Sequence, residues 1–214
     1  MARPRGNYAV TAERRAAILQ SAFEVFARSG YRGGSLKDIA EIVGISEAGI
    51  LHHFKTKSNL LIAVLTYRDD RSGEYLDTNA DSGAEFIDGW LKLIKYNASI
   101  PGVVELFTIL SAEATAVDHP AHEYFQRRYA YVIEVTTRFF QMLREEGRLR
   151  PDIEPDAAAR ALIALSDGLQ VQWLLNKEWD MLEEHRGFFR GVLTEQAGRA
   201  LVPVNGAPLM AAGK

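Results

Sequence analysis

The chain has 214 residues, of which 47% are hydrophobic and 25% charged. A chain of this length buries about 70% of its unfolded surface, so its core needs no disulfide or metal. Because it contains no cysteine, disulfide scaffolds, thiolate metal sites, cysteine nucleophiles and thiol redox chemistry are excluded. Its apolar runs are far shorter than a membrane span, and its N-terminus lacks the apolar stretch of a signal peptide. We therefore expect a soluble cytoplasmic protein with no membrane partner.

The net charge of −3 is unevenly distributed. Residues 1–60 carry nine Lys and Arg against five Asp and Glu, a net charge of +4, which leaves −7 for the rest. A basic head on an acidic body indicates that one end of the protein meets a polyanion. Such a surplus also arises by chance, so it argues for nucleic acid only together with a motif.

The N-terminal part of the chain predicts four helices, because apolar residues recur there at helical spacing between start and stop signals. The first helix runs from Thr11 to Arg28, and a glycine-rich turn follows it. Glycines end the first two helices, at Gly30 and Gly44. Each helix is preceded by a residue whose side-chain oxygen can cap it; these residues are Thr11, Ser35, Ser46 and Thr56.

Longer helices are predicted beyond residue 80. One begins at Asp81 or Ser82, Pro101 suits the first turn of the next, and a third follows His119-Pro120 as far as Gly147. After a connection over residues 148–155, helices are predicted at about 156–176 and 180–200. No segment alternates with period two, so the expected fold is all-α with about nine helices. The predicted parts are an N-terminal domain (1–55), a larger helical domain (56–201) and a mobile tail (202–214).

Two of the short helices, separated by Gly44-Ile45-Ser46, fit a helix-turn-helix. In that motif the first helix crosses the DNA backbone and the second places its exposed face in the major groove. The apolar residues of both helices can form the small core that fixes the angle between them. These residues are Ile39, Ala40, Val43, Ile45, Ile50 and Phe54.

Residues 30–61 contain a more specific run: Gly30-Tyr31…Ser35-Leu36-Lys37-Asp38-Ile39-Ala40…Val43-Gly44-Ile45-Ser46…His52-His53-Phe54-Lys55-Thr56-Lys57-Ser58-Asn59-Leu60-Leu61. This run closely resembles the N-terminal signature of the TetR family of transcriptional regulators. The rest of the chain matches that family in length and helix pattern. The resemblance implies a homodimeric repressor that binds a palindromic operator in double-stranded DNA. It also implies an unidentified small-molecule effector that is bound by the C-terminal domain. This effector would shift the spacing of the two N-terminal domains of the dimer and release the DNA.

By position, the resemblance implies that Ser35 caps the second helix and contacts a phosphate, while His53 and Lys57 contact the DNA backbone. The start of the third helix would face bases or nearby phosphates. The complete implied set is Ser35, Lys37, Ser46, Glu47, Ala48, Gly49, His52, His53 and Lys57.

Several residues depart from the family pattern. Leu51 stands where the family often has Tyr, so one hydroxyl contact to DNA is lost. Gly49 stands where Thr is common and lowers helix propensity by about 1 kcal/mol. Glu47 can accept a hydrogen bond from a cytosine amino group. Four arginines could add phosphate contacts or remain solvated charges, namely Arg3, Arg5, Arg14 and Arg15.

Aromatic and polar residues mix on the central helices, which is the composition of a pocket for an organic ligand. The same residues could simply form the core and its rim. Glu113, inside an otherwise apolar helix, is the first effector candidate. The full set of effector candidates is Trp90, Phe107, Glu113, Tyr131 and Trp173.

The last two predicted helices suit a dimer interface, although monomer core is the competing interpretation. Small residues on the first and an apolar stripe on the second would form the seam. They are Ala157, Ala158, Ala161, Ala164 and Leu165, and Phe188, Phe189, Val192, Leu193 and Ala197.

Sequence patterns give enzyme functions little support. His119 and His122 share a helical face, but no third metal ligand has a suitable spacing. The chain has no phosphate-binding loop and no nucleophile elbow. We expect no cofactor, no metal and no catalytic activity. The alternatives left open are a DNA-binding regulator without an effector or with a corepressor, a helical small-molecule binding protein, and a helical-bundle enzyme.

Overall fold

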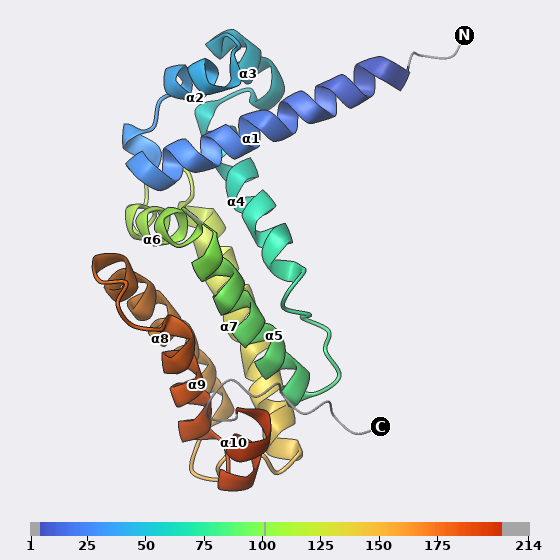
Figure 1. Ribbon diagram of the computed structural model, residues 1–214, viewed down its shortest axis with the longest axis vertical. Helices are drawn as coiled ribbons and strands as arrows, with labels where there is room; N and C mark the ends of the chain where they lie inside the picture. Colours follow the sequence, from blue (N-terminus) through green and yellow to red (C-terminus); the bar gives the residue numbers. More distant parts are fainter. Residues whose placement is uncertain (1–4, 101, 203–214) are drawn as a thin grey trace. The chain divides into compact units, whose positions relative to one another are not determined.

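The computed structural model describes residues 5–100 and 102–202, with side chains from Thr11 onward. These residues form ten α-helices, and their only extended pairing is an isolated antiparallel bridge between Leu149 and Leu193 (Figure 1). The helices are α1 (Arg5–Gly33), α2 (Leu36–Val43), α3 (Glu47–Phe54), α4 (Lys57–Gly73), α5 (Gly83–Ser99), α6 (Val103–Glu113), α7 (His122–Glu145), α8 (Pro155–Leu175), α9 (Met181–Val192) and α10 (Glu195–Leu201). The predicted all-α fold is confirmed.

The described residues divide into two compact units. Unit 1 contains residues 5–70 and 102–125, and unit 2 contains residues 71–100 and 126–202. The chain therefore leaves unit 1 within α4, returns to it at α6 and leaves it again within α7. The predicted boundary between residues 55 and 56 stays a prediction. Arg3, Pro101 and residues 203–214 of the predicted tail lie outside the described residues.

Three of the four predicted caps of unit 1 are confirmed. The hydroxyl oxygen of Ser35 accepts a hydrogen bond from the backbone N–H of Asp38 (3.0 Å), and that of Ser46 accepts one from Gly49 (3.1 Å). Thr56 caps α4 in the same way. The Thr11 cap is wrong, because α1 already begins at Arg5 and Thr11 lies inside it.

The core of unit 1 lies where α1 packs against α2 and α6 (Figure 1). Phe26 and Ile18 of α1 are fully buried there. Within the helix-turn-helix, Gly44 adopts φ 72° and ψ 38°, a left-handed conformation that glycine tolerates best. The predicted small core of this motif is buried at Ile39, Ala40, Ile50 and Phe54 and half-buried at Val43 and Ile45. The sequence pattern therefore fixes the α2–α3 angle through side-chain packing.

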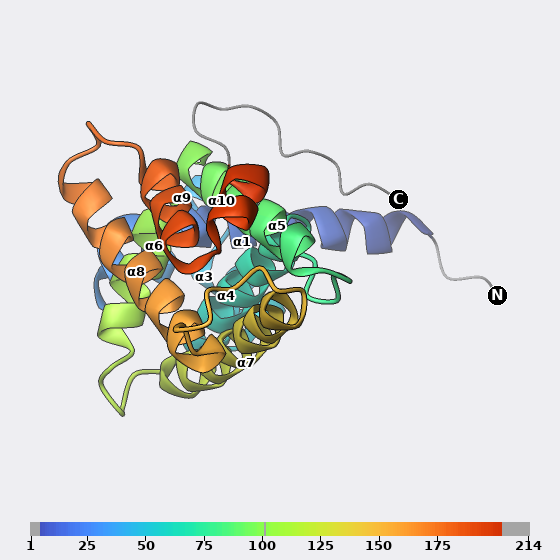
Figure 2. The ribbon, with the colours of Figure 1, turned by 90° about the horizontal axis from the view of Figure 1, so that it is seen from below.

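Unit 2 is built from α5, α9 and their neighbours. Helix α9 packs against α5, α8 and α10, and Figure 2 shows α8 and α9 side by side. The ring of Phe86 on α5 stacks on that of Phe139 on α7, with 4.4 Å between their centroids. At Gly83 a Cβ would come closer than 3.0 Å to the side chain of Leu143, so the helices approach closely only because this residue is glycine.

One prediction for the C-terminal region is wrong. The last predicted helix is two helices, because the backbone at Leu193 is extended (φ −83°, ψ 156°) and pairs with Leu149. The structure therefore has ten described helices rather than about nine. Of the ten residues predicted for the dimer seam, five are buried within this single chain, namely Ala158, Phe189, Val192, Leu193 and Ala197. The other five are exposed or half-buried, namely Ala157, Ala161, Ala164, Leu165 and Phe188, and the seam stays a prediction.

Candidate nucleic-acid interface

The predicted DNA-contacting residues come from α2, α3 and the start of α4, all within unit 1. Five of them are exposed, namely Lys37, Ser46, Glu47, Ala48 and His52. Four are half-buried, namely Ser35, Gly49, His53 and Lys57. All nine residues therefore belong to unit 1, and each is at least partly accessible to solvent.

The two capping serines keep a hydrogen-bonding capacity that DNA can use. Each hydroxyl oxygen accepts a backbone N–H within its own helix, at Ser35 for α2 and at Ser46 for α3. An accepting hydroxyl still carries its own proton, which can be donated to a phosphate oxygen. The positive ends of both helix dipoles lie at these residues and favour an anion.

Positive charge gathers around the end of α3. The rings of His52 and His53 lie 5.6 Å apart, and the guanidinium of Arg15 lies 4.3 Å from the centroid of the Phe54 ring. Burial lowers the pKa of His53, and the nearby positive charges of His52, Arg15 and Arg14 lower it further. A DNA phosphate would relieve this repulsion, so the cluster is suited to a polyanion.

Lys57 begins α4 and is only partly available to solvent. Its ammonium lies 4.5 Å from the centroid of the Tyr31 ring, within the range of a cation–π contact. Burial lowers the pKa of Lys57, whereas the negative charge of Glu113 raises it. Lys37, in contrast, is exposed and lies 4.0 Å from Glu41, a surface pair of small energetic weight.

Two sequence models of known families match the chain. Residues 18–64 match the model described as "Bacterial regulatory proteins, tetR family", which includes the whole helix-turn-helix. Residues 101–190 match the model described as "BetI-type transcriptional repressor, C-terminal". The chain belongs to the TetR family of transcriptional regulators.

Individual TetR-family regulators resemble this one along most of its length. The HTH-type transcriptional repressor KstR2 of Rhodococcus jostii is 26% identical over 162 residues, which are 70% of this chain and 74% of that protein. NalD, the secondary repressor of the MexAB-OprM multidrug efflux pump in Pseudomonas aeruginosa, shares 26% identity and a TM-score of 0.66, covering 86% of this chain and 98% of that one.

A TetR-family regulator from Agrobacterium tumefaciens shares the fold, with a TM-score of 0.73 at 20% identity over 86% of this chain and 99% of that one. These family relationships make the chain a DNA-binding transcriptional regulator. Among the described helices of this TetR-family protein, none is by itself long and apolar enough to cross a membrane; α5 and α6 reach that length and composition only when joined across their bend.

The effector candidates are divided between the two units of this TetR-family protein. In unit 1, Phe107 is buried beside Phe125 with 5.4 Å between ring centroids, and Glu113 accepts a hydrogen bond from the backbone of Tyr31. The sequence identified Glu113 as a polar residue in an apolar helix. Its partner lies 82 positions away and carries no sequence signal of the contact.

The other effector candidates lie in unit 2. Trp90 is 7% exposed and packs near His185, and its indole N–H has no hydrogen-bond partner among the described residues. Trp173 lies beneath the ammonium of Lys177 at 4.6 Å. Tyr131 is 53% exposed. The pocket that Tyr131 lines contains neither Trp90 nor Trp173 among its lining residues.

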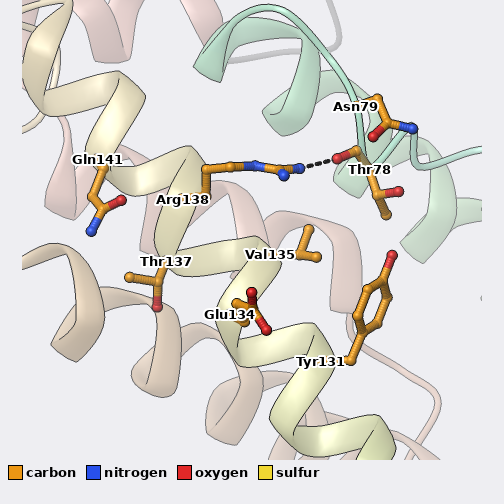
Figure 3. A pocket seen from close by; sticks show the side chains of 8 residues that line it. All are labelled: Thr78, Asn79, Tyr131, Glu134, Val135, Thr137, Arg138 and Gln141. Atoms are coloured by element: carbon orange, nitrogen blue, oxygen red, sulfur yellow. Dashed lines mark hydrogen bonds between the residues drawn. The ribbon is translucent and has the colours of Figure 1, made fainter.

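Tyr131 lines a half-open pocket of about 530 Å³ between α7 and the α4–α5 connection (Figure 3). Figure 3 shows Arg138 reaching from α7 toward the connection, where it donates a hydrogen bond to the carbonyl of Thr78. Glu134 and Val135 lie between Arg138 and Tyr131 along the helix. Sequence reasoning missed these residues, because charged side chains at helical spacing resemble an ordinary solvated face.

His119 and His122, weighed as metal ligands, instead stabilise the connection between α6 and α7. The backbone N–H of Ala121 donates to Nδ1 of His119 (3.2 Å), and Nδ1 of His122 lies 2.8 Å from the carbonyl of Ala114. The described residues contain no group of three or more His, Asp or Glu arranged to hold a metal ion.

Proposed function

We propose that this TetR-family protein is a homodimeric repressor that binds a palindromic operator, with α3 in the major groove, and that a small molecule changes its affinity for DNA. The observation that supports DNA binding is the serine-capped α2–α3 motif, with cationic residues near the end of α3. The proposed contacts are those implied by the sequence, from Ser35 to Lys57. Its site of action would be the cytoplasm, where the DNA is, and its role would be regulation rather than catalysis.

The exposed face of α8 and α9 supports the homodimer. Val171 and Leu175, one helical turn apart on α8, are 46% and 83% exposed. Gly168, Gly187 and Gly191 border open space, where an added Cβ would meet no atom within 4 Å. Exposed apolar residues beside side-chain-free positions suit close packing of helices from a second copy. Two-fold symmetry of such a dimer would match a palindromic operator.

The buried indole N–H of Trp90 supports a small-molecule effector. A buried donor without a partner costs about 1–3 kcal/mol, and an acceptor atom on a bound molecule would remove that cost. The effector would shift an equilibrium between two conformations with different DNA affinity. The effect of added compounds on the DNA complex distinguishes the alternatives. An effector that releases DNA weakens the complex and a corepressor strengthens it. A regulator without an effector shows no change.

A binding assay tests the DNA part. The probe is the DNA immediately upstream of the protein's own gene, followed by genome-wide selection if that fragment is not bound, at two salt concentrations. Lys57→Ala should weaken binding to all sequences and flatten the salt dependence, whereas His52→Ala should also change sequence preference. Lys95→Ala, an exposed lysine of α5 in unit 2, is the matched control for charge.

The proposal fails if selection recovers no bound sequence, or if Lys57→Ala and His52→Ala bind like Lys95→Ala. In that event the helical body becomes the part to study, as a small-molecule binding protein. Turnover of a bound compound would instead support an enzyme.

A further inference from the structure

Glu113, the last residue of α6, is packed against the end of α1. Its Oε2 accepts a hydrogen bond from the backbone N–H of Tyr31 at 2.8 Å. A Cβ on Gly30 would lie closer than 3.0 Å to Oε1, so this glycine makes the approach possible. Gly30 also adopts φ 66° and ψ −174°, a conformation that is essentially restricted to glycine. The carboxylate is therefore held in a defined place by the α1 end.

Tyr31 connects this carboxylate to the start of α4. Its hydroxyl lies 2.9 Å from the hydroxyl of Ser58, and the ammonium of Lys57 lies over its ring. One residue thus contacts Glu113 through its backbone and Lys57 through its side chain. All four of these residues belong to unit 1.

The negative charge of Glu113 is not neutralised by a hydrogen-bonded cation. His119 Nε2 lies 3.5 Å from Oε2, but Nδ1 of that ring accepts a backbone N–H, which places the single proton of neutral His119 on Nε2. Burial lowers the pKa of His119, and the positive charge of Arg32 lowers it further. The negative charges of Glu113 and Asp118 act in the opposite direction. Among the described residues, Glu113 has no hydrogen bond to a lysine or an arginine. Glu113 and Lys57 both contact Tyr31, the carboxylate at its backbone N–H and the ammonium at its ring. Burial lowers the pKa of Lys57, and the negative charge of Glu113 opposes that lowering.

We propose that Glu113 is a positioning residue that holds the Lys57 ammonium on the Tyr31 ring and thereby restrains DNA affinity. The carboxylate of Glu113 and a DNA phosphate are both anions that attract the Lys57 ammonium, so they compete for it. The inference rests on the proposed contact between Lys57 and DNA.

The variant that isolates the charge is Glu113→Gln, since its amide oxygen can still accept the N–H of Tyr31. We expect Glu113→Gln to bind DNA about threefold to tenfold more tightly at low salt, with a gain that shrinks as salt is raised. Glu24→Gln, an exposed residue of α1, changes the net charge equally and is expected to gain much less. Glu113→Asp keeps the charge but shortens the side chain, so it should also gain far less than Glu113→Gln.

A double-mutant cycle with Lys57→Ala decides the mechanism. In the Lys57→Ala background the gain from Glu113→Gln should disappear. The inference is overturned if Glu113→Gln binds no more tightly than the wild type, if Glu113→Asp gains as much, or if the gain persists without Lys57. Failure of the proposed function has a different signature, since Lys57→Ala alone would then leave affinity unchanged. Urea unfolding of each variant confirms that the compared proteins are folded.

Discussion

Replacing Gly30 by alanine perturbs the junction between α1 and α6 at one methyl group. The change has two separate effects, one on the backbone of residue 30 and one on the side chain of Glu113. Alanine at φ 66° and ψ −174° occupies a region that costs roughly 1–3 kcal/mol for a residue with a Cβ. The new Cβ also meets Oε1 of Glu113 and must displace the carboxylate.

Displacement of Glu113 leaves the N–H of Tyr31 without its acceptor. Losing an ionised acceptor in a partly buried place costs roughly 1–3 kcal/mol, and the value should fall toward the lower limit because Glu113 is about one-quarter exposed. The two effects together predict a loss of about 2–4 kcal/mol in the free energy of unfolding of unit 1.

Urea unfolding monitored by circular dichroism measures this loss, and Glu113→Ala provides the comparison. In the Glu113→Ala variant, Gly30→Ala should cost only the free energy of the strained backbone. The interaction free energy between the two substitutions should therefore be about 1–2 kcal/mol. Equal costs of Gly30→Ala in both backgrounds would refute the steric reasoning. A loss below about 1 kcal/mol would refute the backbone reasoning as well.

Four further predictions concern packing, protonation and assembly. Gly83→Ala should destabilise unit 2 by about 1–3 kcal/mol in urea unfolding, because its Cβ would overlap Leu143; an unchanged midpoint would contradict the close approach. Burial lowers the pKa of His185 below its ordinary 6.5, so the unfolded chain takes up a proton first and stability should be lost as pH falls below about 6.5; His185→Gln should flatten this dependence between pH 7.5 and 5.5. DNA phosphates should raise the lowered pKa of His53, so affinity in fluorescence anisotropy should rise by up to about tenfold from pH 8 to 6, and His53→Asn should abolish part of that rise. Leu175→Glu should convert the proposed dimer to monomers in sedimentation experiments without changing helix content; a persistent dimer would place the interface elsewhere.

The sequence predicted the elements whose signals are local. A capping hydroxyl and the N–H that it accepts are three residues apart, so Ser35, Ser46 and Thr56 could be identified without any knowledge of packing. The break at Leu193 could not, since it depends on pairing with Leu149, more than forty residues earlier. Apolar periodicity alone continues through this break, which is why one helix was expected there.

The candidate sites show the same limit. The proposed DNA-contacting residues lie within one short stretch of the chain that has a specific pattern, whereas the effector candidates share only their residue types and lie on separate helices. Trp90 and Phe107 are both buried aromatics, but they belong to different compact units. Glu113 stands out in the sequence as a polar residue in an apolar helix, but a pattern of side chains cannot show that its partner is the backbone of Tyr31. Its effector contact stays a prediction.

The discontinuous composition of unit 1 has a consequence for the synthesis of this protein. Helix α6 covers apolar residues of α1, and Gly102 at its start would place a Cβ against Phe23 and Ala27. A nascent chain that ends near Asp70 contains every proposed DNA-contacting residue but lacks the helix that completes their scaffold. A chain that stopped there would leave this apolar surface of α1 exposed, and exposed apolar surface makes incomplete chains prone to aggregate. We therefore expect unit 1 to reach its full stability only after α6 has been synthesised.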